Sequence, residues 1–104
     1  VRDHHHGQVV TGLHYECHQP LAFGVLRRLA EALRAEHGAL DLIVTHAIGD
    51  LVPGDAAIAI HVRSAHRRSA LAACAAAIEA IKRDLPVWKR EHYADGTHRW
   101  MEGS

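Results

Sequence analysis

The sequence predicts an α+β domain in which two helices and a set of short strands form two layers. Three observations support this fold class. Two long stretches carry apolar residues at helical spacing, short runs rich in β-formers flank them, and proline or glycine closes most runs. The predicted order, β-α-β-β-α-β-β, is typical of a two-layer sandwich. With 104 residues, of which 48% are hydrophobic, the chain is expected to form a single domain over residues 1–104.

The first half of the chain supplies two strands, a helix and a turn. Residues 8–16 are predicted as a strand because valine, leucine and tyrosine supply β-formers. Residues 20–37 are predicted as an amphipathic helix, since leucines recur three and four positions apart and Gly38 ends the pattern. Residues 40–46 are a second apolar strand, and residues 49–55 contain a proline-glycine turn signal.

The second half supplies a strand, a helix and a hairpin. Residues 56–63 are predicted as a strand, and Ser64 is the expected N-cap of a helix that runs to about Asp84. A proline stops this helix, and residues 87–93 and 98–102 are predicted to pair as a hairpin. The inner face of the helix is expected to carry Leu71, Cys74, Ile78 and Ile81.

Composition excludes several classes of protein. The formal net charge is zero, so no general attraction to nucleic acid or to an anionic membrane is expected. No apolar run approaches the ~20 residues of a membrane span, and the first residues are not a signal peptide. Cys17 and Cys74 stand apart, which favours free thiols in a reducing cytoplasm. Because Val1-Arg2 is typical of the end of a strand, an N-terminal strand is expected to be missing.

Two features point to an anion. Residues 63–90 contain seven basic and two acidic residues, which suggests an anionic small molecule or an acidic partner, although a solvated helix face also fits. Within this segment, His66, Arg67 and Arg68 stand near the start of the predicted helix, where the dipole favours negative charge. Free N–H groups at the same place favour a phosphate or carboxylate site, unless the side chains simply extend into water.

Lysine usage points to amine chemistry. The chain has ten arginines but only two lysines, Lys82 and Lys89, which flank Pro86. An arginine cannot supply a neutral amine, because its guanidinium stays protonated. If the bend at Pro86 brings the two ammonium groups together, each depresses the pKa of the other, and one becomes a nucleophile or base. Chance survival of two surface lysines is the alternative, and Lys82 also suits a helix C-terminus.

The histidine clusters are only a weak indication of a metal-binding site. His4-His5-His6 cannot all point to one side of a strand, and no acidic or cysteine cluster supports them. The set His14, Cys17 and His18 has no matching second half. We therefore expect no metal and no cofactor.

The chain resembles the MoaE family, the large subunit of molybdopterin synthase, over nearly its whole length. The resemblance is carried by Val1-Arg2-Asp3-His4, His46-Ala47-Ile48-Gly49-Asp50-Leu51, Pro53-Gly54-Asp55, Ser64-Ala65-His66-Arg67, Lys82 and Pro86-Val87-Trp88-Lys89-Arg90-Glu91. It implies a two-layer α/β hammerhead-type core with an added small β subdomain. It also implies a sulfurtransferase that takes sulfur from the thiocarboxylated C-terminus of a small ubiquitin-like subunit. The sulfur goes to cyclic pyranopterin monophosphate and forms the dithiolene of molybdopterin.

The resemblance also implies the site and the assembly. Lys82 would be the main catalytic lysine, with Lys89 as the second. The implied substrate-binding residues are Arg2, His66, Arg67, Lys82, Lys89, Arg90 and Glu91. A homodimer of large subunits would carry one small sulfur-carrier subunit, ending in Gly-Gly, at each end of a heterotetramer. A non-catalytic anion-binding module and a partner-binding scaffold are the alternatives.

The predicted helix separates two parts of this implied site. His66 and Lys82 are sixteen residues apart, which is about 24 Å along a continuous helix. One small ligand cannot span that distance, so we expect His66 and Arg67 of one protomer to face Lys82 and Lys89 of the other. A broken helix is the alternative, but no glycine or proline lies between Ala65 and Asp84.

Overall fold

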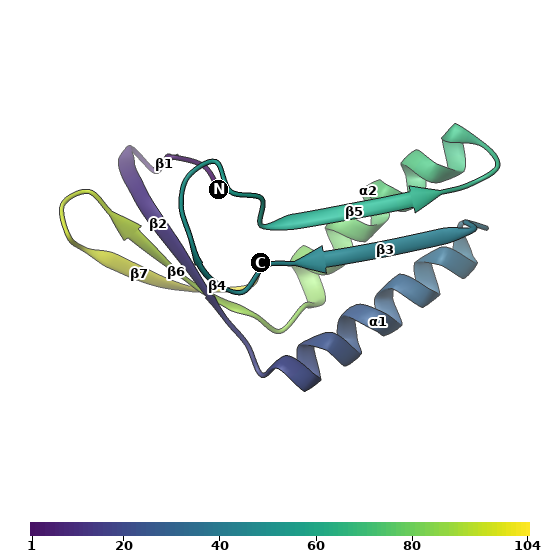
Figure 1. Ribbon diagram of the computed structural model, residues 1–104, viewed down its shortest axis with the longest axis horizontal. Helices are drawn as coiled ribbons and strands as arrows, with labels where there is room; N and C mark the ends of the chain where they lie inside the picture. The colour runs from purple at the N-terminus through teal and green to yellow at the C-terminus, as the bar shows by residue number, and fades with distance from the viewer.

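The computed structural model describes residues 1–104 as an elongated molecule with extents of 48 × 28 × 17 Å. Figure 1 shows helices and a two-stranded sheet running together along the long axis, with a second sheet gathered at one end. The molecule contains two helices and seven strands, so the predicted α+β class is confirmed.

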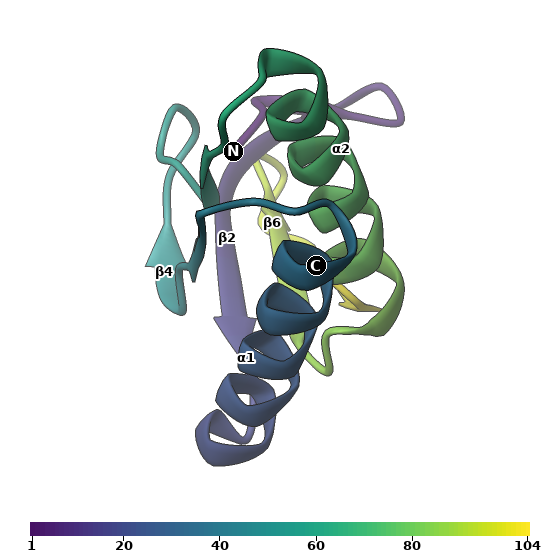
Figure 2. The same ribbon diagram turned by 90° about the vertical axis from the view of Figure 1, so that its right-hand side faces the viewer.

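The helical layer consists of α1 (Gln19–Glu36) and α2 (Arg67–Asp84), which pack against each other. They lie against the antiparallel pair β3 (Asp41–His46) and β5 (Ile58–Arg63), with α1 on β3 and α2 on β5. Figure 2 shows the two helices next to each other, with the second sheet behind them. Neither helix has both the length and the apolar character that crossing a membrane requires.

The second sheet is antiparallel throughout and is built around its longest strand. Its members are β1 (His4–His5), β2 (Gln8–Glu16), β4 (Gly49–Leu51), β6 (Trp88–Tyr93) and β7 (His98–Glu102). β2 pairs with β1, β4 and β6, and β7 extends the sheet beyond β6. Leu13 lies opposite Glu91 and Tyr15 opposite Lys89, so these four side chains share one face.

One apolar cluster joins the two layers. Its six buried residues are Leu13, Tyr15, Ala22, Ile81, Leu85 and Val87. Because the cluster includes the end of α2 and the segment after it, this part of the chain is held against β2. Pro86 lies between Leu85 and Val87, where the chain leaves the helix and enters β6.

Two expectations for α2 are wrong. Its N-cap is His66, not Ser64, whose hydroxyl hydrogen-bonds instead to a serine in the first helical turn at 2.8 Å. Leu71 is 69% exposed, whereas Ala73 and Ala77 are fully buried. The helix therefore buries mainly alanines, which allows close packing against the neighbouring elements, and Leu71 lies outside that face. Ile81, near the end of the helix, is buried as expected.

The strands differ from the prediction in two places. Gly49–Leu51 forms β4 inside the predicted turn, and His4–His5 forms β1 near the start of the chain. Val1 and Arg2 lie outside the strands, and the Val1 amino group donates a hydrogen bond to the Asp55 carbonyl at 2.6 Å. Both missed strands are too short to show an alternating pattern. The other predicted elements are present with closely similar bounds.

Candidate active site

A cavity of about 300 Å³ lies where β2, β6 and the end of α2 meet. It is lined by Val1, Arg2, Leu13, Tyr15, Ala57, Lys82, Lys89 and Glu91. Three of these side chains are cationic and one is a carboxylate. The cavity therefore favours an anionic ligand that also has an apolar surface.

Lys82 and Lys89 reach this cavity from different elements. Lys82 belongs to the last turn of α2, and Lys89 belongs to β6, which starts after the bend at Pro86. Both amines donate to the main-chain oxygen of Ser104, the last residue of the chain, with Nζ–O distances of 3.2 Å for Lys82 and 3.5 Å for Lys89. The structure therefore brings the two lysines together, as their spacing around the proline predicted.

The cavity alters the protonation of Lys89. Burial lowers the pKa of its amine, and the charges of Lys82 and Arg2 lower it further, while Glu91 opposes them. A lowered pKa increases the fraction of neutral amine at a given pH, and the neutral amine is the form that acts as a nucleophile or base. The predicted effect of one lysine on the other is therefore present at Lys89, with burial as the larger cause.

Glu91 supplies the negative charge of the cavity. It is only 4% exposed, and its Oε1 accepts a hydrogen bond from His5 Nδ1 at 2.6 Å. Burial alone would raise the pKa of this carboxyl, but hydrogen bonds from His5 and Tyr93 and the charges of His5 and Arg2 lower the pKa overall. Glu91 therefore stays ionised and offsets part of the cationic charge around it.

His46 lies next to the cavity, in a neighbouring apolar pocket, and was not among the expected site residues. Its Nδ1 donates to the Ala47 carbonyl at 2.7 Å, and its Nε2 accepts from the Ser104 hydroxyl at 2.8 Å. Burial lowers the pKa of the imidazole and the charge of Lys82 lowers it further, although the hydrogen bond to Ala47 opposes both. The only signal in the sequence was the place of His46 at the start of a family motif.

His66 and Arg67 lie at the opposite end of α2 from the lysines. The helix is continuous from Arg67 to Asp84, so the broken-helix alternative is wrong. His66 is the N-cap but makes no side-chain capping bond, and no acidic residue stands in the first turn. The first N–H groups of the helix therefore remain available to an anion. Within one chain, this helix end and the cavity remain separate.

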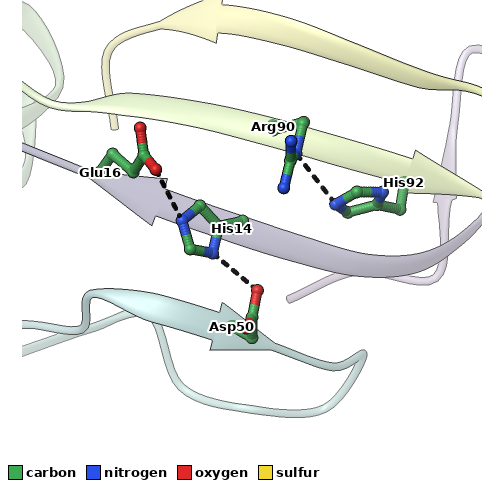
Figure 3. A network of polar contacts seen from close by, with 5 residues as sticks. All are labelled: His14, Glu16, Asp50, Arg90 and His92. Carbon is green, nitrogen blue, oxygen red and sulfur yellow. Dashed lines mark hydrogen bonds and ion pairs between the residues drawn. The ribbon is translucent and has the colours of Figure 1, made fainter.

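Arg90 does not line the cavity, which corrects the expectation for this residue. Side chains alternate along a strand, so Arg90 points to the opposite face of the sheet from Lys89 and Glu91. Its guanidinium lies over the ring of Trp100, 5.0 Å from the centroid, and its Nε donates to His92 Nε2 at 3.2 Å. Figure 3 shows the contact between Arg90 and His92.

The same outer face carries a polar network around His14 (Figure 3). His14 Nδ1 lies 2.6 Å from Asp50 Oδ1, and its Nε2 lies 3.2 Å from Glu16 Oε1. The hydrogen bond to Asp50 raises the pKa of His14, and Glu16 adds to this effect, while burial opposes it. The contact with Asp50 joins β2 to β4. His18, another histidine of the weak metal signal, caps α1 by accepting from the Leu21 N–H.

The three consecutive histidines have different surroundings. His4 Nδ1 contacts the Asp3 carboxylate at 3.0 Å, and His5 bonds to Glu91. The ring of His6 lies beside the ring of His5, with 4.0 Å between centroids. No group of three or more histidine, cysteine or acidic side chains is arranged to hold a metal ion.

The chain is similar to proteins of molybdenum cofactor synthesis. A family model described as MoaE protein matches residues 1–84. The molybdopterin synthase catalytic subunit of Nostoc sp. is 33% identical over 102 residues, which cover 97% of this chain and 62% of that protein. Molybdopterin synthase catalytic subunit 1 of Aedes aegypti is 38% identical over 105 residues, covering 98% of this chain and 68% of that protein.

The fold is also similar to a solved structure. The crystal structure of molybdopterin synthase from Staphylococcus aureus matches with a TM-score of 0.90 and 34% sequence identity. The match covers 97% of this chain and 73% of that chain. The chain therefore aligns almost completely, while it spans less than two thirds of the length of the Nostoc relative.

Proposed function

Because the chain belongs to the MoaE family, we propose that it acts as the catalytic large subunit of a molybdopterin synthase in the cytoplasm. In this role it is a sulfurtransferase. Sulfur leaves the thiocarboxylated C-terminus of a small ubiquitin-like carrier and enters cyclic pyranopterin monophosphate, where it forms the dithiolene of molybdopterin.

One observation carries this proposal: the amines of Lys82 and Lys89, which line a cationic cavity, converge on a single oxygen atom, the main-chain oxygen of the terminal residue Ser104. A thiocarboxylate presents a carbonyl oxygen and a sulfur that share one negative charge, so it forms charge-assisted hydrogen bonds with both amines. The role of catalytic lysine falls to Lys82, and Lys89 supports it as the amine with the lowered pKa.

The surroundings of the bound carbonyl suit the tail of the carrier. Gly103 precedes Ser104, donates its N–H to the Val87 carbonyl at 2.8 Å and has a φ of +95°. An extended segment that contains glycine therefore fits beside β6, because glycine tolerates this backbone angle and close contact. We infer that the Gly-Gly end of the carrier takes this path to Lys82 and Lys89 in place of residues 103–104.

The substrate requires contacts from two protomers. Arg2 stands in the cavity, whereas His66 and Arg67 stand at the far end of a continuous α2, about 24 Å away by helical rise. The phosphate of the substrate therefore binds at His66 and Arg67 of one protomer, and its reacting carbons lie at the lysines of the other. This arrangement requires a homodimer, which with two carriers makes a heterotetramer.

Two other functions fit part of the geometry. A non-catalytic module would bind an anion through the same charges, and a scaffold would hold the carrier without chemistry. Neither requires an amine that loses its proton. The lowered pKa of Lys89 in a buried site favours the enzyme over both alternatives.

Replacing Lys82 by arginine tests the proposal. Lys82→Arg keeps the positive charge but removes the amine, so single-turnover sulfur transfer from a thiocarboxylated carrier should slow by about 10²-fold or more. The matched control is Arg83→Lys at the next residue, an exposed side chain that pairs with Asp84. The control should transfer sulfur at the wild-type rate. If Lys82→Arg keeps more than about half of that rate, the assigned role of Lys82 is wrong.

A further inference from the structure

Ser104, the last residue of the chain, contacts both lysines of the cavity and also contacts His46. Its carbonyl oxygen accepts from the amines of Lys82 and Lys89, and its hydroxyl donates to His46 Nε2 at 2.8 Å. The hydroxyl oxygen is separated from the carbonyl carbon of the same residue by only three covalent bonds. A carbonyl held by the lysines therefore has an O–H group beside its carbon, and that O–H group faces the histidine.

This geometry matches the needs of a hydrolytic step. Once the thiocarboxylate sulfur has bonded to a carbon of the substrate, the carrier remains attached through a thioester. Water must then cleave the bond between the acyl carbon and sulfur. The attack places negative charge on the carbonyl oxygen, and the N–H groups of Lys82 and Lys89 directed at that oxygen stabilise the charge as an oxyanion hole does. A base is needed to take the proton from the water.

We propose that His46 is this general base, and that it acts on the water that releases the carrier from the sulfurated substrate; the inference rests on the proposed function. The water oxygen bonds to the acyl carbon, and the proton passes from the water to His46 Nε2. The carbon–sulfur bond to the carrier breaks, and its electron pair stays on the sulfur of the substrate. That sulfur receives the proton back from His46. The carrier leaves as a carboxylic acid, which ionises in solvent.

The hydrogen bonds of His46 fix the required tautomer. The Ala47 carbonyl can only accept, so Nδ1 carries the hydrogen and Nε2 is left as the acceptor. The groups that face the imidazole are the ammonium of Lys82 from α2 and the ring of Tyr15 from β2, which lies edge-on with 4.8 Å between centroids. Burial and the Lys82 charge lower the pKa of His46, so the ring is unprotonated at neutral pH and ready to accept a proton.

The test separates formation of the thioester from its hydrolysis. The full chain is mixed with substrate and a carrier protein that ends in a Gly-Gly thiocarboxylate, and quenched samples are followed by intact mass. His46→Gln keeps polar contacts but cannot take up a proton near neutral pH. The covalent adduct of carrier and substrate should form at the wild-type rate and then accumulate, because its hydrolysis is slowed by about 10²-fold.

Chemical rescue distinguishes a base from a structural residue. His46 lines an apolar pocket of about 170 Å³, and His46→Ala enlarges the space there. Added imidazole should therefore restore hydrolysis of the adduct in His46→Ala and leave His46→Gln unchanged. The matched control is His61→Gln, an exposed histidine on β5, which should behave as the wild type.

Three results overturn the inference. Hydrolysis by His46→Gln at the wild-type rate removes the need for this base. Equal loss of adduct formation and hydrolysis, without accumulation or rescue, assigns His46 a structural role. If the wild-type chain forms neither adduct nor product, the proposed function fails and the role of His46 fails with it. The first two results contradict the role of His46 but leave the proposed sulfurtransferase function in place.

Discussion

The amine of Lys89 is a direct probe of the electrostatics of the cavity. Since the chain has only two lysines, reductive methylation with a ¹³C reagent gives two lysine resonances, besides that of the N-terminus. The Lys89 resonance should titrate below the ordinary lysine value of 10.5, because burial and the charges of Lys82 and Arg2 disfavour the ammonium form. Two-dimensional NMR across a pH series measures the midpoint, and the Lys89→Arg spectrum assigns the signal.

Two variants separate the causes of this shift. Lys82→Gln removes a positive charge and should move the Lys89 midpoint upward, whereas Glu91→Gln removes the opposing negative charge and should move it downward. If the Lys89 midpoint lies at or above 10.5 in the protein without substitutions, the burial of this amine is contradicted.

The sequence identified the two lysines but not the histidine beside them. Scarcity of lysine and the proline between Lys82 and Lys89 were sufficient to predict that the amines meet. His46 is one of eleven histidines, and only its place at the start of a family motif distinguishes it from the others. Its role depends on Ser104, which is distant in sequence, and such a contact leaves no local pattern.

At the level of secondary structure, His14 links the short edge strand β4 to β2. Its pKa is raised above the ordinary 6.5 by the hydrogen bond to Asp50 and by Glu16, so the folded protein holds this proton more tightly than the unfolded chain does. The resulting stabilisation is complete below the unfolded pKa and is lost as the pH rises through the folded pKa. His14→Gln should therefore lower the free energy of unfolding more at about pH 5.5 than at about pH 9.

Urea denaturation at the two pH values measures this difference. The contacts of His14 lie at the surface, so His14→Gln should lower the free energy of unfolding at low pH by a few tenths to about 1 kcal/mol. His61→Gln serves as the control, since His61 has no such carboxylate partners in the structure. An equal effect of His14→Gln at both pH values would show that its contacts with Asp50 and Glu16 do not depend on charge.

The elements differ in how far the sequence determines them. α1 was predicted closely because leucine spacing extends along the helix, and the hairpin of β6 and β7 because a proline precedes it and a turn separates its two strands. β4 was missed because three residues carry no period, and its existence depends on pairing with β2. Leu71 was placed inside because leucine is the larger apolar residue, whereas α2 buries three alanines and, near its end, Ile81.

At the level of the whole molecule, the length of α2 makes a prediction about the dimer. Arg67→Ala and Lys82→Ala should each inactivate the protein, because each damages every shared site. When the two variants are mixed under conditions that exchange subunits, a mixed dimer has one site with both defects and one intact site. Sulfur transfer should therefore reappear in the mixture.

Subunit exchange is measured separately, with native mass spectrometry of isotope-labelled protein. A mixture of Arg67→Ala with itself in labelled and unlabelled form is the matched control, and it should exchange without gaining activity. If mixed dimers form and no sulfur transfer returns, the two ends of α2 do not belong to one shared site.

The two tryptophans give the second sheet an optical signal of its own. Trp88 and Trp100 lie on β6 and β7, on the outer face of the second sheet, and neither helix contains a tryptophan. Their fluorescence therefore reports on the hairpin that carries Lys89, while far-ultraviolet circular dichroism is dominated by α1 and α2. Comparing the two signals during denaturation measures whether the helical layer and the lysine-bearing sheet unfold as one cooperative unit.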